Sequence, residues 1–132
     1  MPGYTVRVLD EVTNIFEGNY PGEMRMITYD IGAEQVALTY RRMPQHTGGK
    51  GSYGHFHKEQ EELYLVLSGR LQFKLDDEVV EVVGPACVRV APSTARSIWN
   101  DEPEDGHLLI ISTRMPDGAP DDAVLVENFW PE

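Results

Sequence analysis

Apolar and polar residues alternate over short stretches of this chain, and turn-forming residues separate the stretches. The clearest stretch is 70–75, where Leu71, Phe73 and Leu75 share one face and polar side chains occupy the other. A period of two is typical of a strand with one buried face. The same reasoning predicts further strands at 24–31, 35–43, 62–68, 79–83, 87–91, 95–100 and 107–114. Short strands at this regular spacing indicate an all-β sandwich or barrel.

The predicted strands divide the chain into a barrel and two flanking segments. We expect an N-terminal extension over 1–35, which packs on the barrel or on a partner subunit and contains one helical turn near 10–18. The barrel itself spans 36–114, with a glycine-rich loop at 44–52. A tail over 115–132 docks back on the barrel through the apolar residues that follow 122.

The strand predicted at 62–68 has apolar residues on both faces. Leu63, Leu65 and Leu67 occupy one face, and the other face carries Tyr64 and Val66. A strand of this kind is usually covered on both sides, because three exposed leucines would form an unusual patch. The N-terminal segment or a second copy of the chain could supply the cover, and we expect a homodimer.

Composition and charge narrow the classes of function. The chain has 132 residues, 41% of them hydrophobic, which suits one globular domain. Its net charge of −11 gives no basic stripe for nucleic acid and no basic amphipathic segment for a membrane. The start lacks the pattern of a signal peptide, and the single Cys87 excludes an internal disulfide. We expect a cytoplasmic protein in which Cys87 is buried and inert.

Two of the four histidines lie two positions apart, with a carboxylate close behind. His55 and His57 point to the same side of an extended strand. Glu62 can join them as a third ligand if residues 58–61 loop out, and Glu61 is the nearby rival. Two imidazoles and one carboxylate form a facial ligand set for a transition metal with open positions. The strand alternation puts Glu62 on the same side as Tyr64, which we expect to line the pocket.

We expect the remaining histidines and the tryptophans to be structural or surface residues rather than metal ligands. We interpret His46, in the glycine-rich loop, as a surface residue and His107 as a structural residue at a strand start. Trp99 and Trp130 are interpreted as core residues or as part of a dimer cover.

The region around the histidine pair resembles the first motif of the cupin superfamily. Gly49, His55, His57, Glu62 and Gly69 stand at every fixed position of that motif. Residues 84–100 resemble the second motif in outline, from its opening glycine through a proline to the closing asparagine, with slightly different spacing. The resemblance extends over about 36–114 and implies a double-stranded β-helix, a jelly-roll barrel with a site inside its mouth.

The second motif departs from the family at one position. Arg96 stands four residues before Asn100, where the resemblance leads us to expect a third metal-binding histidine. Arginine stays protonated and is not a normal metal ligand. The ligand set implied by the family is therefore reduced to His55, His57 and Glu62.

Two arrangements of the site follow from this departure. In the first, the three remaining ligands hold Zn, Fe, Mn or Ni and Arg96 faces a bound anion. In the second, the site is metal-free and Arg96 pairs with Glu62. Ile98 shares a face with Arg96 and forms a wall of the pocket in either case.

Two functions correspond to these arrangements. The first is a metal-dependent oxygenase or isomerase that acts on a small polar or anionic substrate. The second is a non-catalytic sensor or carrier of a small ligand, because one fold hosts many chemistries.

Overall fold

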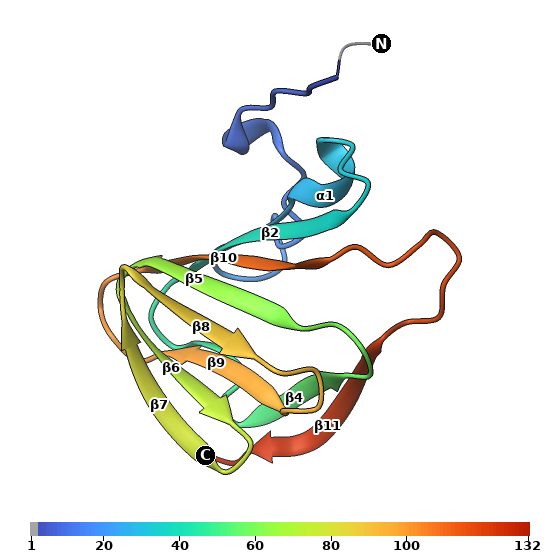
Figure 1. The fold of residues 1–132 in the computed structure, drawn as a ribbon. Coiled ribbons are helices and arrows are strands. Elements are labelled where there is room, and N and C mark those ends of the chain that lie inside the picture. The colour runs from blue at the N-terminus through green and yellow to red at the C-terminus, as the bar shows by residue number, and fades with distance from the viewer. Residues whose placement is uncertain (1–2) are drawn as a thin grey trace.

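The computed structural model describes residues 3–132, and its secondary structure is almost entirely strand (Figure 1). The helical elements are two single turns, η1 (Leu9–Glu11) and α1 (Ile27–Asp30). The strands are β1 (Glu23–Met26), β2 (Val36–Met43), β3 (Thr47–Gly48), β4 (Ser52–His57), β5 (Glu62–Ser68), β6 (Arg70–Leu75), β7 (Glu78–Val83), β8 (Ala86–Val90), β9 (Arg96–Asn100), β10 (Gly106–Thr113) and β11 (Ala123–Trp130).

The strands form two antiparallel sheets that face one another. One sheet has the order β1-β2-β10-β5-β8, and the other has the order β11-β4-β9-β6-β7, with β3 paired to β9. Neighbours in each sheet come from distant parts of the chain, as in a jelly roll. The predicted all-β jelly-roll fold is confirmed.

The main core lies between the two sheets. Leu71 and Phe73 of β6 are fully buried there, as the alternation of 70–75 predicts, together with Val66 of β5 and Leu108 of β10. The residues opposite them on neighbouring strands are also apolar, so side chains from both sheets fill the space between the sheets.

The N-terminal segment packs on the outer face of the first sheet. Val12 and Ile27 form a second small core with Tyr40 of β2. In Figure 1 this blue segment lies above β2 and β10, at the opposite side of the molecule from β7. The tail also joins the fold, because β11 pairs with β4 along 123–126.

Three local predictions need correction. The strand predicted at 24–31 ends at Met26, where the chain turns into α1 and buries Ile27 and Thr28. The loop at 44–52 contains the short strand β3. Cys87 is exposed, because it alternates to the outer face of β8 while Val90 faces the core.

The outer face of β5 is only partly covered. Leu63 and Leu67 remain 44% and 42% exposed, and Leu65 is half-buried. The apolar contacts of the N-terminal segment are with β2 and β10, and the homodimer that would cover β5 stays a prediction. Within residues 3–132, no helix has the length and hydropathy that crossing a membrane requires.

Candidate metal centre and barrel cavity

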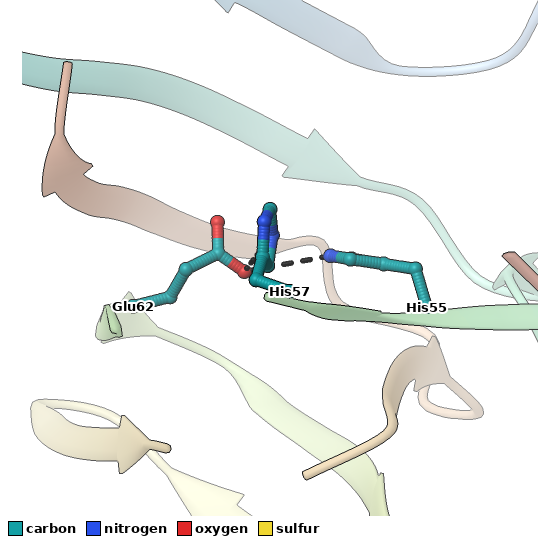
Figure 2. A group of neighbouring side chains, drawn as sticks. All are labelled: His55, His57 and Glu62. Carbon is teal, nitrogen blue, oxygen red and sulfur yellow. Dashed lines mark ion pairs between the residues drawn. The ribbon is translucent and has the colours of Figure 1, made fainter. Parts of the chain in front are cut away.

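Two strands that follow one another in the chain, one in each sheet, bring the predicted metal ligands together (Figure 2). His55 and His57 project from one side of β4, and Glu62 is the first residue of β5 after the connecting loop. The Nε2 atoms of His55 and His57 lie 3.4 and 3.3 Å from the same carboxylate oxygen, Oε1 of Glu62. His57 and Glu62 are buried, whereas His55 is partly open.

The separations of these donor atoms suit a metal ion. All three donors lie within 4.8 Å of one another. Two ligands at ~2.1 Å from one ion, at a tetrahedral angle, are themselves about 3.4 Å apart. Both ring nitrogens of His57 are buried and form no hydrogen bond with the described chain, and Nε2 is the one that faces Glu62. An ion between the three residues would satisfy that atom.

Glu62 carries the negative charge of the cluster. Burial raises its pKa, but the contacts with His55 and Tyr64 and the nearby charges of His57 and Arg96 outweigh burial and lower the pKa to about 2. The Tyr64 hydroxyl donates a hydrogen bond of 2.6 Å to Oε1 of Glu62. Burial and the Glu62 charge raise the pKa of Tyr64 well above its usual value, so the hydroxyl remains a donor.

Arg96 lies beside the cluster, at the position where the resemblance implies a third histidine. It pairs with His55 across β4 and β9, and its side chain is fully buried. Its terminal nitrogens donate to the carbonyl oxygens of Val90, Ala91 and Pro92 at 3.2 to 3.5 Å. Its Nε atom lies 3.6 Å from Oε1 of Glu62, a single contact rather than a bidentate pair. Most of the guanidinium is therefore committed to the backbone.

Asp122 also contacts the predicted metal ligand His57, although no local sequence pattern indicates it. Its Oδ2 lies 3.4 Å from Nδ1 of His57, and its carboxylate accepts the backbone N–H groups of Glu59 and Gln60. Burial raises the pKa of Asp122, but these N–H groups and His57 outweigh burial and lower it. A carboxylate behind a metal-binding imidazole orients the ring and fixes its tautomer.

A cavity of about 550 Å³ opens beside the cluster. His55, Tyr64, Arg96 and Ile98 are among its lining residues, so these sequence-predicted residues share one space. His57 and Glu62 stand behind them. The N-terminal segment closes part of the cavity, with Phe16 among the residues that it contributes.

Arg41 also lines the cavity and was missed by the sequence analysis. A signal for it existed, because Arg41 and Arg42 are consecutive in β2 and one of them must face inward. Arg42 points outward and pairs with Glu23 and Asp105.

The other candidates lie away from the cluster. Glu61 is exposed and pairs with Arg89 at 3.0 Å, so Glu62 is the glutamate that faces inward. His46 is exposed and stacks on Trp99. His107 contacts the Tyr40 hydroxyl through Nδ1 at 2.6 Å. Trp130 is buried, as expected for a core residue.

Comparison with known proteins identifies the architecture. No family model matches the sequence, and no curated protein matches it. A similar structure is that of a sugar phosphate isomerase from Silicibacter pomeroyi, which is described as a member of a cupin superfamily. Its TM-score is 0.71, and the two sequences are 18% identical over 93% of this chain and 92% of that chain. A predicted oxalate decarboxylase from Thermotoga maritima gives a TM-score of 0.66 and 18% identity over 83% and 99% of the two chains.

A third structure is longer than this chain. It is a candidate sugar phosphate isomerase from Acidithiobacillus ferrooxidans, with a TM-score of 0.61 and 20% identity. The match covers 71% of this chain and 60% of that one. Identities this low establish a shared fold and leave the chemistry to be argued from the site.

Proposed function

We propose that this chain, which has the double-stranded β-helix fold of the cupin superfamily, binds a divalent transition metal ion through His55, His57 and Glu62. The ion would be Zn, Fe, Mn or Ni, since imidazole and carboxylate ligands suit all four. The barrel cavity would take a small organic ligand, and the protein would act on it as a metal-dependent oxygenase or isomerase.

One observation carries the proposal. Two imidazole nitrogens converge on one carboxylate oxygen, and the buried Nε2 of His57 is left without a hydrogen-bond partner among residues 3–132. A buried polar atom without a partner is costly unless something else satisfies it. The Asp122 carboxylate at Nδ1 favours the tautomer whose lone pair lies on Nε2, the atom that faces Glu62.

The residues around this metal centre would have separate roles. A bound ion would polarise a carbonyl group or activate dioxygen, and three protein ligands leave positions open for either. Tyr64 holds Glu62 in place through its hydrogen bond, and Arg96 holds the loop that carries Val90 to Pro92. Ile98 offers apolar contact to a ligand in the cavity.

A second candidate is a metal-free binding module that acts as a sensor or carrier of a small ligand. The contacts of Glu62 favour it, because Tyr64 and Arg96 already give the carboxylate a donor and a positive neighbour. In this alternative Nε2 of His57 has only its 3.3 Å contact with Oε1 of Glu62, which meets the distance for an ion pair but not the geometry of a hydrogen bond. We therefore prefer the metal-dependent function.

Elemental analysis of untagged protein tests the proposal. We expect close to one transition metal ion per chain, and the loss of most of it in H57A. The matched control is H46A, which removes an exposed histidine outside the cluster. Metal that survives H57A would refute the site, and oxygen uptake or isomerisation assays with a panel of small acids would then separate an enzyme from a binding module.

We also propose that the protein is a homodimer of the cytoplasm. The exposed Leu63 and Leu67 on β5 support the dimer, since a second copy would cover them. The unpaired thiol of Cys87 suits a reducing compartment. Light scattering at micromolar concentration tests the assembly, and a monomeric mass would contradict it.

A further inference from the structure

Arg41 is a cation without a charged partner in the described part of the chain. It lies in β2 opposite Leu108 of β10, whose side chain is fully buried in the core, so both project inward. The other arginine of the pair, Arg42, forms ion pairs with Glu23 and Asp105, whereas no carboxylate of residues 3–132 lies within ion-pair distance of Arg41. The Nε atom of Arg41 is buried and has no hydrogen-bond partner in residues 3–132.

Phe16 offers Arg41 only partial compensation. The guanidinium carbon lies 5.8 Å from the centre of the Phe16 ring, which is the outer limit of a cation–π contact. Such a contact accepts no hydrogen bond, so it leaves the Nε–H donor unsatisfied. Burial lowers the pKa of Arg41, yet a guanidinium stays protonated in proteins. The side chain is half-buried at the cavity wall, so an anion in the cavity would both pair with its charge and accept its free donor.

The side chains that line the cavity around Arg41 include cations but no carboxylate, and Glu62 lies behind the lining, where it contacts His55 and Arg96 and not Arg41. The charged or titratable lining residues are Arg41, Arg96, His55 and three tyrosines, and none of the lining residues is Asp or Glu. The chain carries a net charge of −11, so the absence of acids from this one surface is not a reflection of composition. A cavity with this lining attracts anions and disfavours cations.

The rest of the cavity wall is largely apolar. Ile15, Phe16, Met24, Ile98 and Ile110 face it, and they come from both sheets and from the N-terminal segment. A sugar phosphate presents hydroxyl groups on every side, and these would lose hydrogen bonds against such a wall. A molecule with an apolar body and one anionic group fits the lining better.

Arg96 and Arg41 both line the cavity, but they differ in the donors that they have free. The terminal nitrogens of Arg96 donate to backbone carbonyls, and its Nε faces Glu62. Arg41 forms no such contact with the described residues. Arg41 therefore has more donors to offer to an anion than Arg96.

We propose that Arg41 binds the carboxylate of a small apolar or aromatic acid in the barrel cavity. This inference rests on the proposed function for the cavity as a ligand site, but not on the presence of a metal. The planar guanidinium matches a carboxylate in a two-point contact, and the apolar wall takes the body of the acid. The Phe16 ring, whose centre lies 5.8 Å from the guanidinium carbon, lines the same cavity and adds to its apolar wall.

Calorimetry with a matched pair of probes tests this assignment. The probes are 2-naphthoate and 2-naphthamide, which share one apolar body and differ in charge. The full-length protein is titrated as isolated and again after treatment with a chelator. We expect 2-naphthoate to bind roughly 10- to 100-fold more tightly than the amide. The R41Q variant should lose this preference, and R41K should lose part of it because its ammonium lacks the planar fork.

R89Q is the matched control, because it removes one positive charge from an exposed surface site. It should retain the full preference for 2-naphthoate. Equal affinity for the two probes, no binding of either, or a preference that survives R41Q would each overturn the proposal. Circular dichroism checks that the variants are folded, and R41K serves if R41Q is not.

The design separates this inference from the proposed metal site. Loss of metal on chelation with the naphthoate preference intact would leave Arg41 as the anion contact. A preference that disappears on chelation would place the contact at the metal and overturn the inference. Inorganic phosphate is a third probe, and phosphate that binds as tightly as 2-naphthoate would contradict the carboxylate class.

Discussion

The Nδ1 atom of His57 lies 3.4 Å from Oδ2 of Asp122, a residue in the loop before β11. Backbone N–H groups from Glu59 and Gln60 hold the same carboxylate at 2.8 to 3.1 Å. The loop between β4 and β5 and the loop before β11 thus meet at one buried acid. The His57 ring therefore lies between two carboxylates, with Nδ1 toward Asp122 and Nε2 toward Glu62.

The first prediction concerns Asp122. D122N keeps the shape of the side chain but removes the negative charge behind His57, so the apparent metal affinity should fall about 10- to 100-fold. Competition against a metal indicator measures it. D121N is the matched control, since Asp121 is its exposed neighbour, and its affinity should match that of the unaltered protein. Equal affinities for D122N and D121N would show that Asp122 does not orient the ligand.

Removal of the Tyr64 hydroxyl should destabilise the metal-free protein. Y64F deletes the donor at 2.6 Å from the buried Glu62 carboxylate, and the free energy of unfolding should fall by about 1.5–3 kcal/mol. Unfolding by denaturant in the presence of a chelator measures the change. Y53F removes a hydroxyl from an exposed tyrosine and should change little. A similar loss of unfolding free energy in Y64F and Y53F would show that the Tyr64 hydroxyl has no special stabilising role.

Arg96 should matter more for stability than for ligand affinity. R96M deletes the donors to three backbone carbonyl oxygens and the positive neighbour of Glu62. Breaking a buried charged contact of this kind costs about 3–5 kcal/mol. R70M removes an arginine that is 46% exposed, and it should cost about 1 kcal/mol or less. Urea unfolding that gives R96M the stability of the unaltered protein would contradict the structural role.

Glu23 should make the stability of the N-terminal segment depend on pH. The hydrogen bond from Arg42 lowers the pKa of Glu23; burial opposes this effect, and contacts with Arg25 reinforce it. The folded pKa lies below the usual value of 4.5, so the stabilisation is complete above pH 4.5 and is lost as the pH falls through the folded pKa.

E23Q should therefore be less stable at neutral pH by about 1–3 kcal/mol. The difference from the unaltered protein should shrink as the pH falls below 4.5, the ordinary value for this carboxyl group. Denaturant unfolding over a pH series measures both quantities. A difference that stays constant with pH would mean that the charge of Glu23 is not the cause.

Local alternation was sufficient to predict most of the sheets. Leu71 and Phe73 fall on one face of β6 in the sequence, and both are buried in the core. The prediction failed at 27–30, where the segment Ile27–Asp30 forms a helical turn that packs on β2. Its β-branched residues suit a strand locally, and tertiary packing decides otherwise.

The candidate site was predictable where its residues lie close in sequence. His55, His57 and Glu62 lie within eight consecutive residues, on two strands joined by a short loop, so spacing alone indicated that they could meet. Asp122 reaches the same point from the other end of the chain, through the pairing of β11 with β4. No local pattern encodes such a contact, because it depends on how distant strands pair.

Anomalous X-ray diffraction would show directly whether His55, His57 and Glu62 bind a metal ion. Crystals of untagged protein would be measured at the absorption edge of the metal found by elemental analysis. The account predicts one strong peak at ~2.0–2.2 Å from Nε2 of His55, Nε2 of His57 and the Glu62 carboxylate. The peak should vanish in H57A crystals. No peak among these three side chains, or a peak that persists in H57A, would contradict the metal centre.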